Sequence, residues 1–249
     1  MKSGLVSISF RKLKPEEIVK LCVKCDLGEI EWGGDVHVPL GNMETAHRVY
    51  HVTHDAGLNV CCYGSYIRMT KSERTLFPSL IDTARALGAP SVRIWAGNSE
   101  DANMDEIVES TQILSAMADD LIFTFEYHRG TLTHDETTAS TLMKHIDRPN
   151  VKSQWQPPID LNESGCLASI ETMRPWLHNV HAFSWEGTRR LPLSAKEQNW
   201  RKYIAALAGD RVILLEFVKD DDPINLVHDA ATLNAWLKET TDKTQPVGY

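Results

Sequence analysis

The sequence has no long apolar run, and this absence excludes a helix that spans a membrane. Such a helix needs about 20 consecutive, predominantly apolar residues, and no run of 18 or more occurs here. The first residues also lack an apolar signal core and a small-residue cleavage site. We therefore expect a cytoplasmic protein that has no membrane partner.

Basic residues are fewer than acidic ones. The chain has 26 Lys and Arg against 34 Asp and Glu, which gives a formal net charge of −8. Proteins that bind nucleic acids obtain much of their affinity from Lys and Arg clustered beside the phosphate backbone. We therefore expect no nucleic-acid partner.

Cysteines are also few. Their number, five, is odd, which argues against a full disulfide framework. Cys22 and Cys25 form a Cys-x-x-Cys pair, but no second pair follows it. Reduced, structural cysteines are therefore favoured over zinc or redox chemistry.

The main pattern in the chain is a short apolar run followed by a longer helical pattern, repeated eight times. The expected strands are 5–10, 29–32, 59–64, 91–95, 121–126, 150–155, 180–185 and 211–216. The expected helices are 15–25, 43–56, 73–87, 104–118, 136–146, 163–174, 196–208 and 225–239. Eight alternations in 249 residues predict an α/β protein with a single (β/α)8 TIM barrel domain over residues 1–249. A doubly wound open sheet is the competing fold, but no Gly-x-Gly-x-x-Gly loop follows a strand.

Four expected strand ends carry a side chain that can bind a divalent metal: Glu126, Gln156, His181 and Glu216. They are 30, 25 and 35 residues apart, about one strand-plus-helix unit each, so they are expected to surround one end of the barrel. Barrel enzymes have their active sites at the C-terminal ends of the strands. Two carboxylates buried together are costly without a cation, so the set predicts a metal or a cationic substrate.

Aromatic residues gather at the same strand ends. Four of the seven tryptophans lie there: Trp32, Trp95, Trp155 and Trp185. Indole faces suit the C–H face of a sugar ring, and the alternative is that these rings cap the barrel core. Arg93 occupies an interior-facing strand position, where an unpaired charge is expensive. We expect it to pair with Glu31 or Glu126, or to bind an anionic or hydroxyl group of a substrate.

Several motifs fall where these strands end. They are the Glu31 strand with its His37 loop, Tyr-Gly-Ser-Tyr at 63–66, Arg-Ile-Trp-Ala-Gly at 93–97, Glu-Tyr-His with Gly-Thr-Leu-Thr at 126–133, His181, and Leu-Glu-Phe-Val at 215–218. Through them, nearly the whole chain resembles the xylose isomerase-like TIM barrels, the sugar-phosphate isomerase and epimerase group. Barrels of that family are often dimers, so the resemblance leaves a homodimer open.

The resemblance also implies a ligand set. Ketose epimerases of the family hold a divalent metal through Glu, Asp, His and Glu after strands 5, 6, 7 and 8. The matching positions look like Glu126, Gln156, His181 and Glu216. Gln156 replaces the Asp, and Ile159 stands where many members have a His. An amide oxygen can still bind Mn, Mg, Co or Zn, but we expect a lower metal affinity.

The activity that the resemblance implies is a metal-dependent isomerase or epimerase acting on a small, sugar-like polyhydroxy carbonyl compound. Glu126 and Glu216 would be the catalytic acid and base, working through a cis-enediolate. The residues expected to bind substrate are His37, Tyr66, Arg93, Trp95, His128, Trp155 and Trp185. An unphosphorylated substrate is slightly favoured, because no loop has a clear phosphate cradle.

Three other functions are weighed against this one. A lyase of the inosose-dehydratase kind would use the same enediolate to expel a hydroxyl group. A non-catalytic sugar-binding barrel is favoured by Gln156 alone. An endonuclease would need more His and Asp ligands and a basic surface, and the net charge of −8 argues against that surface.

Overall fold

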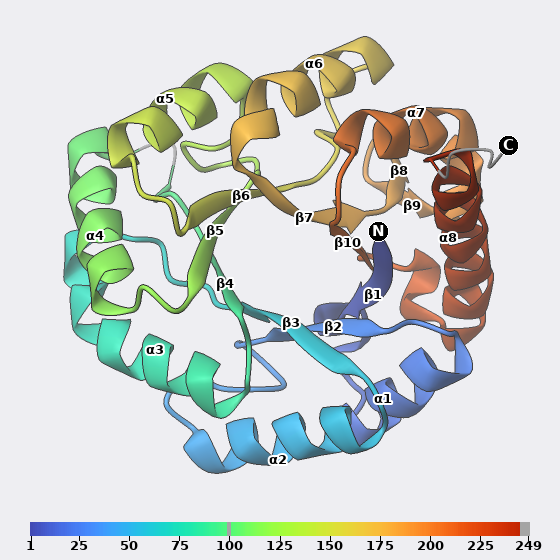
Figure 1. Cartoon of the computed structure of the whole chain (residues 1–249), viewed down its shortest axis with the longest axis horizontal. Coiled ribbons are helices and arrows are strands. Elements are labelled where there is room, and N and C mark those ends of the chain that lie inside the picture. Colours follow the sequence, from blue (N-terminus) through green and yellow to red (C-terminus); the bar gives the residue numbers. More distant parts are fainter. Residues whose placement is uncertain (99–100, 245–249) are drawn as a thin grey trace, which may run out of the picture.

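Eight parallel strands form a closed barrel in the computed structural model, which describes residues 1–98 and 101–244 (Figure 1). The barrel closes because β1 pairs with both β2 and β10. The strands are β1 Lys2–Val6, β2 Glu29–Gly33, β3 Asn59–Gly64, β4 Ser91–Ile94, β5 Ile122–Glu126, β6 Val151–Trp155, β7 Leu177–Ala182 and β10 Val212–Leu215. The predicted (β/α)8 fold is confirmed, and the open-sheet alternative is wrong.

An outer layer of eight α-helices surrounds the strands (Figure 1). They are α1 Pro15–Lys24, α2 Met43–Asp55, α3 Phe77–Ala86, α4 Met104–Met117, α5 Glu136–Ile146, α6 Glu163–Met173, α7 Glu197–Leu207 and α8 Pro223–Thr244. Several begin at a side chain that accepts a hydrogen bond from the first turn, which satisfies an otherwise unpaired N–H group. Asn42, Asn103, Asp135 and Asn162 act in this way.

Two expected strands have bounds that differ by more than one residue at each end. The first strand was expected over 5–10, but β1 ends at Val6 and a 3-10 helix (η1) follows at Ser7–Phe10. The Ser7 hydroxyl accepts a hydrogen bond of 2.8 Å from the Gly33 N–H, which fixes this turn over the barrel end. The strand expected over 180–185 ends at Ala182, and an antiparallel hairpin follows it, β8 Ser184–Glu186 and β9 Arg189–Leu191.

Two expected helices also differ. The helix expected over 73–87 is divided into a 3-10 helix at Lys71–Leu76 and α3, which has Pro78 in its first turn. A proline is readily accommodated there because the first turn needs no N–H donor. The last helix, α8, begins two residues before and ends five residues after the expected range of 225–239.

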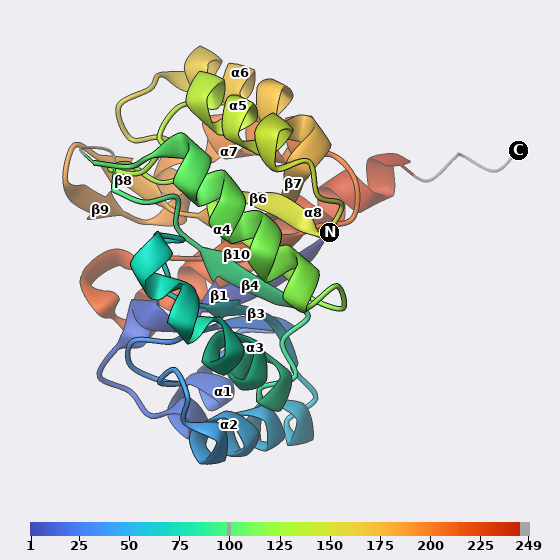
Figure 2. The same ribbon diagram turned by 90° about the vertical axis from the view of Figure 1, so that its left-hand side faces the viewer.

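The two ends of the barrel are distinct. In Figure 2 the β8–β9 hairpin lies at one end and the N-terminus at the other, so the C-terminal ends of the strands open beside the hairpin. In the described part of the chain, no helix combines the length and the apolar character that crossing a bilayer requires.

Candidate metal and active site

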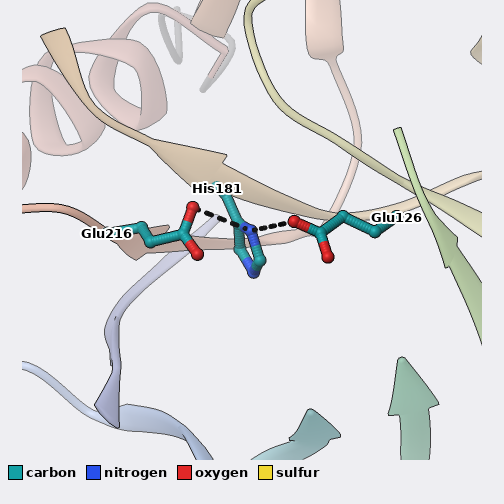
Figure 3. Close-up of side chains that lie close together, drawn as sticks. All are labelled: Glu126, His181 and Glu216. Carbon is teal, nitrogen blue, oxygen red and sulfur yellow. Dashed lines mark ion pairs between the residues drawn. The ribbon is translucent and has the colours of Figure 1, made fainter. Parts of the chain in front are cut away.

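A cluster of three buried side chains lies where β5, β7 and β10 end (Figure 3). Glu126, His181 and Glu216 each bring one possible ligand atom to within 4.8 Å of the others. The Nδ1 atom of His181 is 3.2 Å from Glu216 Oε2 and 3.8 Å from Glu126 Oε1. Three of the four predicted ligands are thus brought together by strands that are distant in sequence.

Several polar atoms at this end of the barrel have no hydrogen-bond partner. His181 Nδ1 and Glu216 Oε2 are close together but not aligned for a hydrogen bond, and both are buried. Gln156 Oε1 is also buried and unpartnered. Buried polar atoms are nearly always satisfied. An imidazole nitrogen, a carboxylate oxygen and an amide oxygen left in this way fit the donor set of a divalent cation.

Arg93 pairs with two carboxylates, one of which is Glu126 of the cluster. Its Nε donates to Glu31 Oε1 at 2.7 Å, and its Nη1 donates to Glu126 Oε2. Trp95 Nε1 donates to the same Glu126 oxygen at 2.6 Å. The expected pairing of Arg93 with Glu31 or Glu126 is confirmed, and it occurs with both. Glu126 is left with Oε1 facing His181.

These contacts shift the pKa values of the buried groups. Burial raises the pKa of Glu126, but the charges of Arg93, His181 and His128 together outweigh burial and lower the pKa below its usual range. For Glu31, the charges of His181 and Arg93 likewise overcome burial and hold its pKa well below normal. Burial would lower the pKa of His181, but Glu216 and Glu31 raise it to about 10.

The buried charges of the site do not cancel one another. The site has three carboxylates, Glu31, Glu126 and Glu216, and one guanidinium, Arg93, which pairs with the first two; two negative charges are left before His181 is counted. A proton on His181 offsets one of them. A divalent cation beside a neutral imidazole offsets both. The residues present therefore fit a divalent metal in charge as well as in donor type.

A hollow of about 670 Å³, part of it open to solvent, lies at this mouth of the barrel. Its lining includes Tyr127 and Phe217, the residues that follow Glu126 and Glu216 in the chain. One part of the lining is polar, with His128, Arg129, His134 and Gln156. Another part is aromatic, with Phe183, Trp185 and Phe217 in mutual contact, and Trp185 Nε1 there is buried without a partner. Such a lining suits a small molecule that has both hydroxyl groups and C–H faces.

Four predicted substrate-binding residues form one connected group beside the cluster. The rings of Trp95 and His128 stack with centroids 4.7 Å apart, and Tyr66 packs against Trp95 at 5.7 Å. The Arg93 guanidinium lies 5.3 Å from the centre of the Tyr66 ring. Trp95 connects this group to Glu126 through its hydrogen bond.

Trp155 does not line the hollow. It is completely buried on the helix side of β6, donates to Ser169 of α6 at 3.0 Å, and packs against Trp200 and Tyr203 of α7. Successive side chains of a strand point to opposite faces, so Trp155 faces away from the interior that Gln154 faces. The expectation that Trp155 contacts a substrate does not fit this position.

His37 and Trp32 also lie away from the hollow. The two ring nitrogens of His37 contact Ser7 Oγ at 3.0 Å and the Leu13 carbonyl oxygen at 3.2 Å, and the ring packs edge-on against Trp32. Trp32 is completely buried and donates to Thr53 of α2. Through these contacts His37 connects the loops after β1 and β2, so its position does not fit the expected substrate contact. Of the four strand-end tryptophans, only Trp95 and Trp185 lie at the mouth.

Gln154 was not anticipated as part of the site. It is completely buried, its Nε2 donates to Glu31 Oε2 at 2.6 Å and also contacts His181 Nε2, and its Oε1 accepts from Thr124 at 3.1 Å. The signal for it is in the sequence, because Gln154 lies two positions before Gln156 and alternate residues of an extended segment share a face.

Comparisons with known proteins support the fold. No protein-family model matches the chain, and no curated protein matches its sequence. Among solved structures, the probable 3-DHS dehydratase AsbF of Bacillus anthracis has a TM-score of 0.80 and 22% identity, over 94% of this chain and 99% of that one. D-psicose 3-epimerase of Clostridium cellulolyticum H10, solved with D-tagatose, has a TM-score of 0.74 and 13% identity, over 96% and 99%.

A third solved structure with the same fold contains a bound metal. The xylose isomerase-like TIM barrel protein of Mycobacterium smegmatis, in complex with magnesium, has a TM-score of 0.69 and 13% identity, over 96% of this chain and 97% of that one. The resemblance to xylose isomerase-like barrels is therefore confirmed for the fold. Identities this low show the fold alone, since one fold supports many activities.

Proposed function

We propose that the chain is an enzyme that isomerises or epimerises a small sugar-like polyhydroxy carbonyl compound with the help of a divalent metal. The observation that carries this proposal is the buried Glu126, His181 and Glu216 cluster, whose surroundings have an excess of negative charge. The likeness to an epimerase and to a magnesium-bound barrel supports it at the level of the fold.

The metal, Mn, Mg, Co or Zn, would be held by the free oxygens of Glu126 and Glu216, by His181 Nδ1 and by Gln156 Oε1. When bound, it would supply Lewis-acid polarisation of the substrate carbonyl. Gln156 contributes a neutral oxygen, so the site should bind metal more weakly than one with four charged or imidazole ligands.

Glu126 and Glu216 are suited to proton transfer because they lie on either side of His181 (Figure 3). One carboxylate removes the proton from the carbon next to the carbonyl, which gives a cis-enediolate. The other carboxylate returns a proton, to the opposite face in an epimerisation or to the adjacent carbon in an isomerisation. His128, Trp95, Tyr66 and Trp185 would orient the hydroxyl groups and C–H faces, while Arg93 orients Glu126.

A dehydratase is the second candidate. The observation that favours it is the TM-score of 0.80 to a probable dehydratase. In this reaction the same carboxylate pair removes a proton and the enediolate expels a neighbouring hydroxyl group as water. The two candidates differ in the mass of the product, which is lower by one water in the second.

The test is incubation of the metal-loaded protein with a panel of ketoses and cyclic polyhydroxy ketones in deuterated water. An isomerase or epimerase incorporates deuterium at the reacting carbon, and a dehydratase forms a product that lacks one water. Glu126→Gln and Glu216→Gln should each lower kcat by about 10²-fold or more, since general acid–base groups contribute about 10²–10⁴-fold.

The matched control is Glu29→Gln. Glu29 is also a buried glutamate, but it lies on β2 and pairs with Lys2 at 2.9 Å. This variant should keep its activity. Full activity in both site variants on an identified substrate would overturn the proposal. A tightly bound sugar that returns unchanged and undeuterated would instead support a non-catalytic binding barrel.

A further inference from the structure

Glu31 is a completely buried carboxylate in the barrel interior, and its oxygens contact the polar groups of Arg93, Gln154 and His181. Arg93 Nε donates to its Oε1 at 2.7 Å. Gln154 Nε2 donates to its Oε2 at 2.6 Å, and His181 Nε2 lies 3.0 Å from the same oxygen. The sequence predicts Glu31 only as one of two expected partners of Arg93, and no comparison assigns it a part in the site, yet it contacts the ring that forms the centre of the cluster.

We propose that Glu31 is a positioning residue that accepts the Nε2–H of His181 and so directs the Nδ1 lone pair toward a metal between Glu126 and Glu216. The inference rests on the metal site of the proposed function. A second hydrogen bond of this kind, from the far nitrogen of a histidine ligand to a carboxylate, fixes the tautomer and orientation of the ring.

The contacts of the ring determine which nitrogen has the proton. Nδ1 is buried, has no aligned hydrogen-bond partner, and lies near Glu126 Oε1 and Glu216 Oε2 (Figure 3). With a proton on Nδ1 alone, that N–H would be a buried donor without an aligned acceptor, and the Nε2 lone pair would face the lone pairs of Glu31. A proton on Nε2 removes both penalties and makes a charge-assisted hydrogen bond to Glu31, at the cost of a contact between that N–H and the amide nitrogen of Gln154, which is also a donor.

Gln154 is the competing partner of Nε2, because its amide nitrogen contacts that atom as well. The orientation of the amide is fixed by Thr124, which donates to Oε1, and by Glu31, which accepts from Nε2. Gln154 therefore helps to hold Glu31. A neutral amide is also a weaker partner for the ring than a carboxylate.

Arg93 connects Glu31 to Glu126, the second proposed ligand of the metal. It joins Glu31 to Glu126, so one guanidinium fixes the residue that orients His181 and also a carboxylate of the cluster. Gly64 on β3 leaves the space that this pair needs, because a Cβ there would lie 2.8 Å from Glu31 Oε1 and 2.9 Å from Arg93 Nη2.

The first experiment measures the affinity of the metal-stripped full chain for Mn²⁺ by titration, for the wild type, Glu31→Gln and Glu29→Gln. Glu29 is the matched control, because it is a buried glutamate on the same strand whose partners are Lys2 and Asn59. Loss of an outer hydrogen-bond partner of a metal ligand costs about 10–100-fold in affinity. We expect that loss in Glu31→Gln and an unchanged Kd in Glu29→Gln.

A second measurement uses only the wild type and so does not depend on the folding of a variant. In the Zn²⁺-loaded, 15N-labelled wild type, ring nitrogen spectra should show the His181 proton on Nε2 and no proton on Nδ1. A ring protonated on Nδ1, or equal Mn²⁺ affinities in all three proteins, would overturn the inference and leave the proposed function intact. A wild type that takes up no metal would overturn both.

Discussion

Asp229, in α8, shows how one buried carboxyl can make stability depend on pH. Its side chain is only 5% exposed, and Oδ1 accepts a hydrogen bond of 2.8 Å from the Leu193 N–H. Burial raises its pKa from 3.8 to about 6. The folded state therefore binds the proton more tightly than the unfolded state, and this group lowers stability as pH rises from about 4 to about 6.

Asp229→Asn should remove that penalty, because the amide keeps the acceptor oxygen and carries no charge. We expect the variant to exceed the wild type by roughly 3 kcal/mol in free energy of unfolding at pH 7.5, as one pKa unit corresponds to about 1.4 kcal/mol. The gain should disappear near pH 4. Denaturant unfolding at the two pH values measures the difference, and a gain that does not change with pH would contradict the assignment.

The alternation of side chains along a strand decides which residues of the site the sequence can predict. The pairing of Arg93 followed from its interior position. Nearness to a strand end predicts Trp155 at the mouth, and this prediction is wrong because the side chain points to the helix side of the strand. Gln154, on the opposite face from Trp155, was overlooked for the same reason.

At the scale of elements, the loop between β6 and α6 carries part of the hollow, with Gln156 and Pro157 in its lining. The loop ends at Asn162, whose side chain accepts the Gly165 N–H at 2.9 Å and so caps α6. The cap fixes the place where the loop ends and the helix begins.

Asn162→Ala should cost about 1 kcal/mol in free energy of unfolding, the usual loss for an N-cap asparagine. Asn162→Asp is the matched control, since aspartate accepts the same hydrogen bond and suits the positive end of the helix. Thermal and denaturant unfolding of the two variants would measure the cap, and equal losses in both would show that it contributes nothing.

Element types could be read from the sequence more reliably than element ends. The expected strand over 180–185 contained the end of β7 and the start of the β8–β9 hairpin, and both parts are apolar and aromatic enough to read as one strand. Local pattern carries no signal for the turn of the chain at Phe183, because packing against Trp185 and Phe217 stabilises it.

At the scale of the whole molecule, metal binding should be coupled to folding, since the ligands come from β5, β7 and β10 and meet only in the closed barrel. A ligand that binds only the folded state at 100 times its Kd adds about 2.7 kcal/mol of stability. Mn²⁺ should therefore raise the Tm of the wild type, and a chelator should reverse the increase.

Glu216→Ala is the control for this coupling. It removes one carboxylate of the cluster, so Mn²⁺ should leave its Tm nearly unchanged. An equal increase in both proteins would indicate binding elsewhere on the acidic surface rather than at the barrel mouth.

The polar layer inside the barrel also bears on how the chain is made. Glu31 and Arg93 lie in the first half and can neutralise each other early in synthesis, whereas Glu126, His181 and Glu216 all lie in the second half. Glu31 and His181 are separated by 150 residues, and Glu216 follows the last strand, β10. The polar layer is complete only after that strand has left the ribosome, so a nascent chain that stops short of β10 has an open barrel with this layer exposed to water.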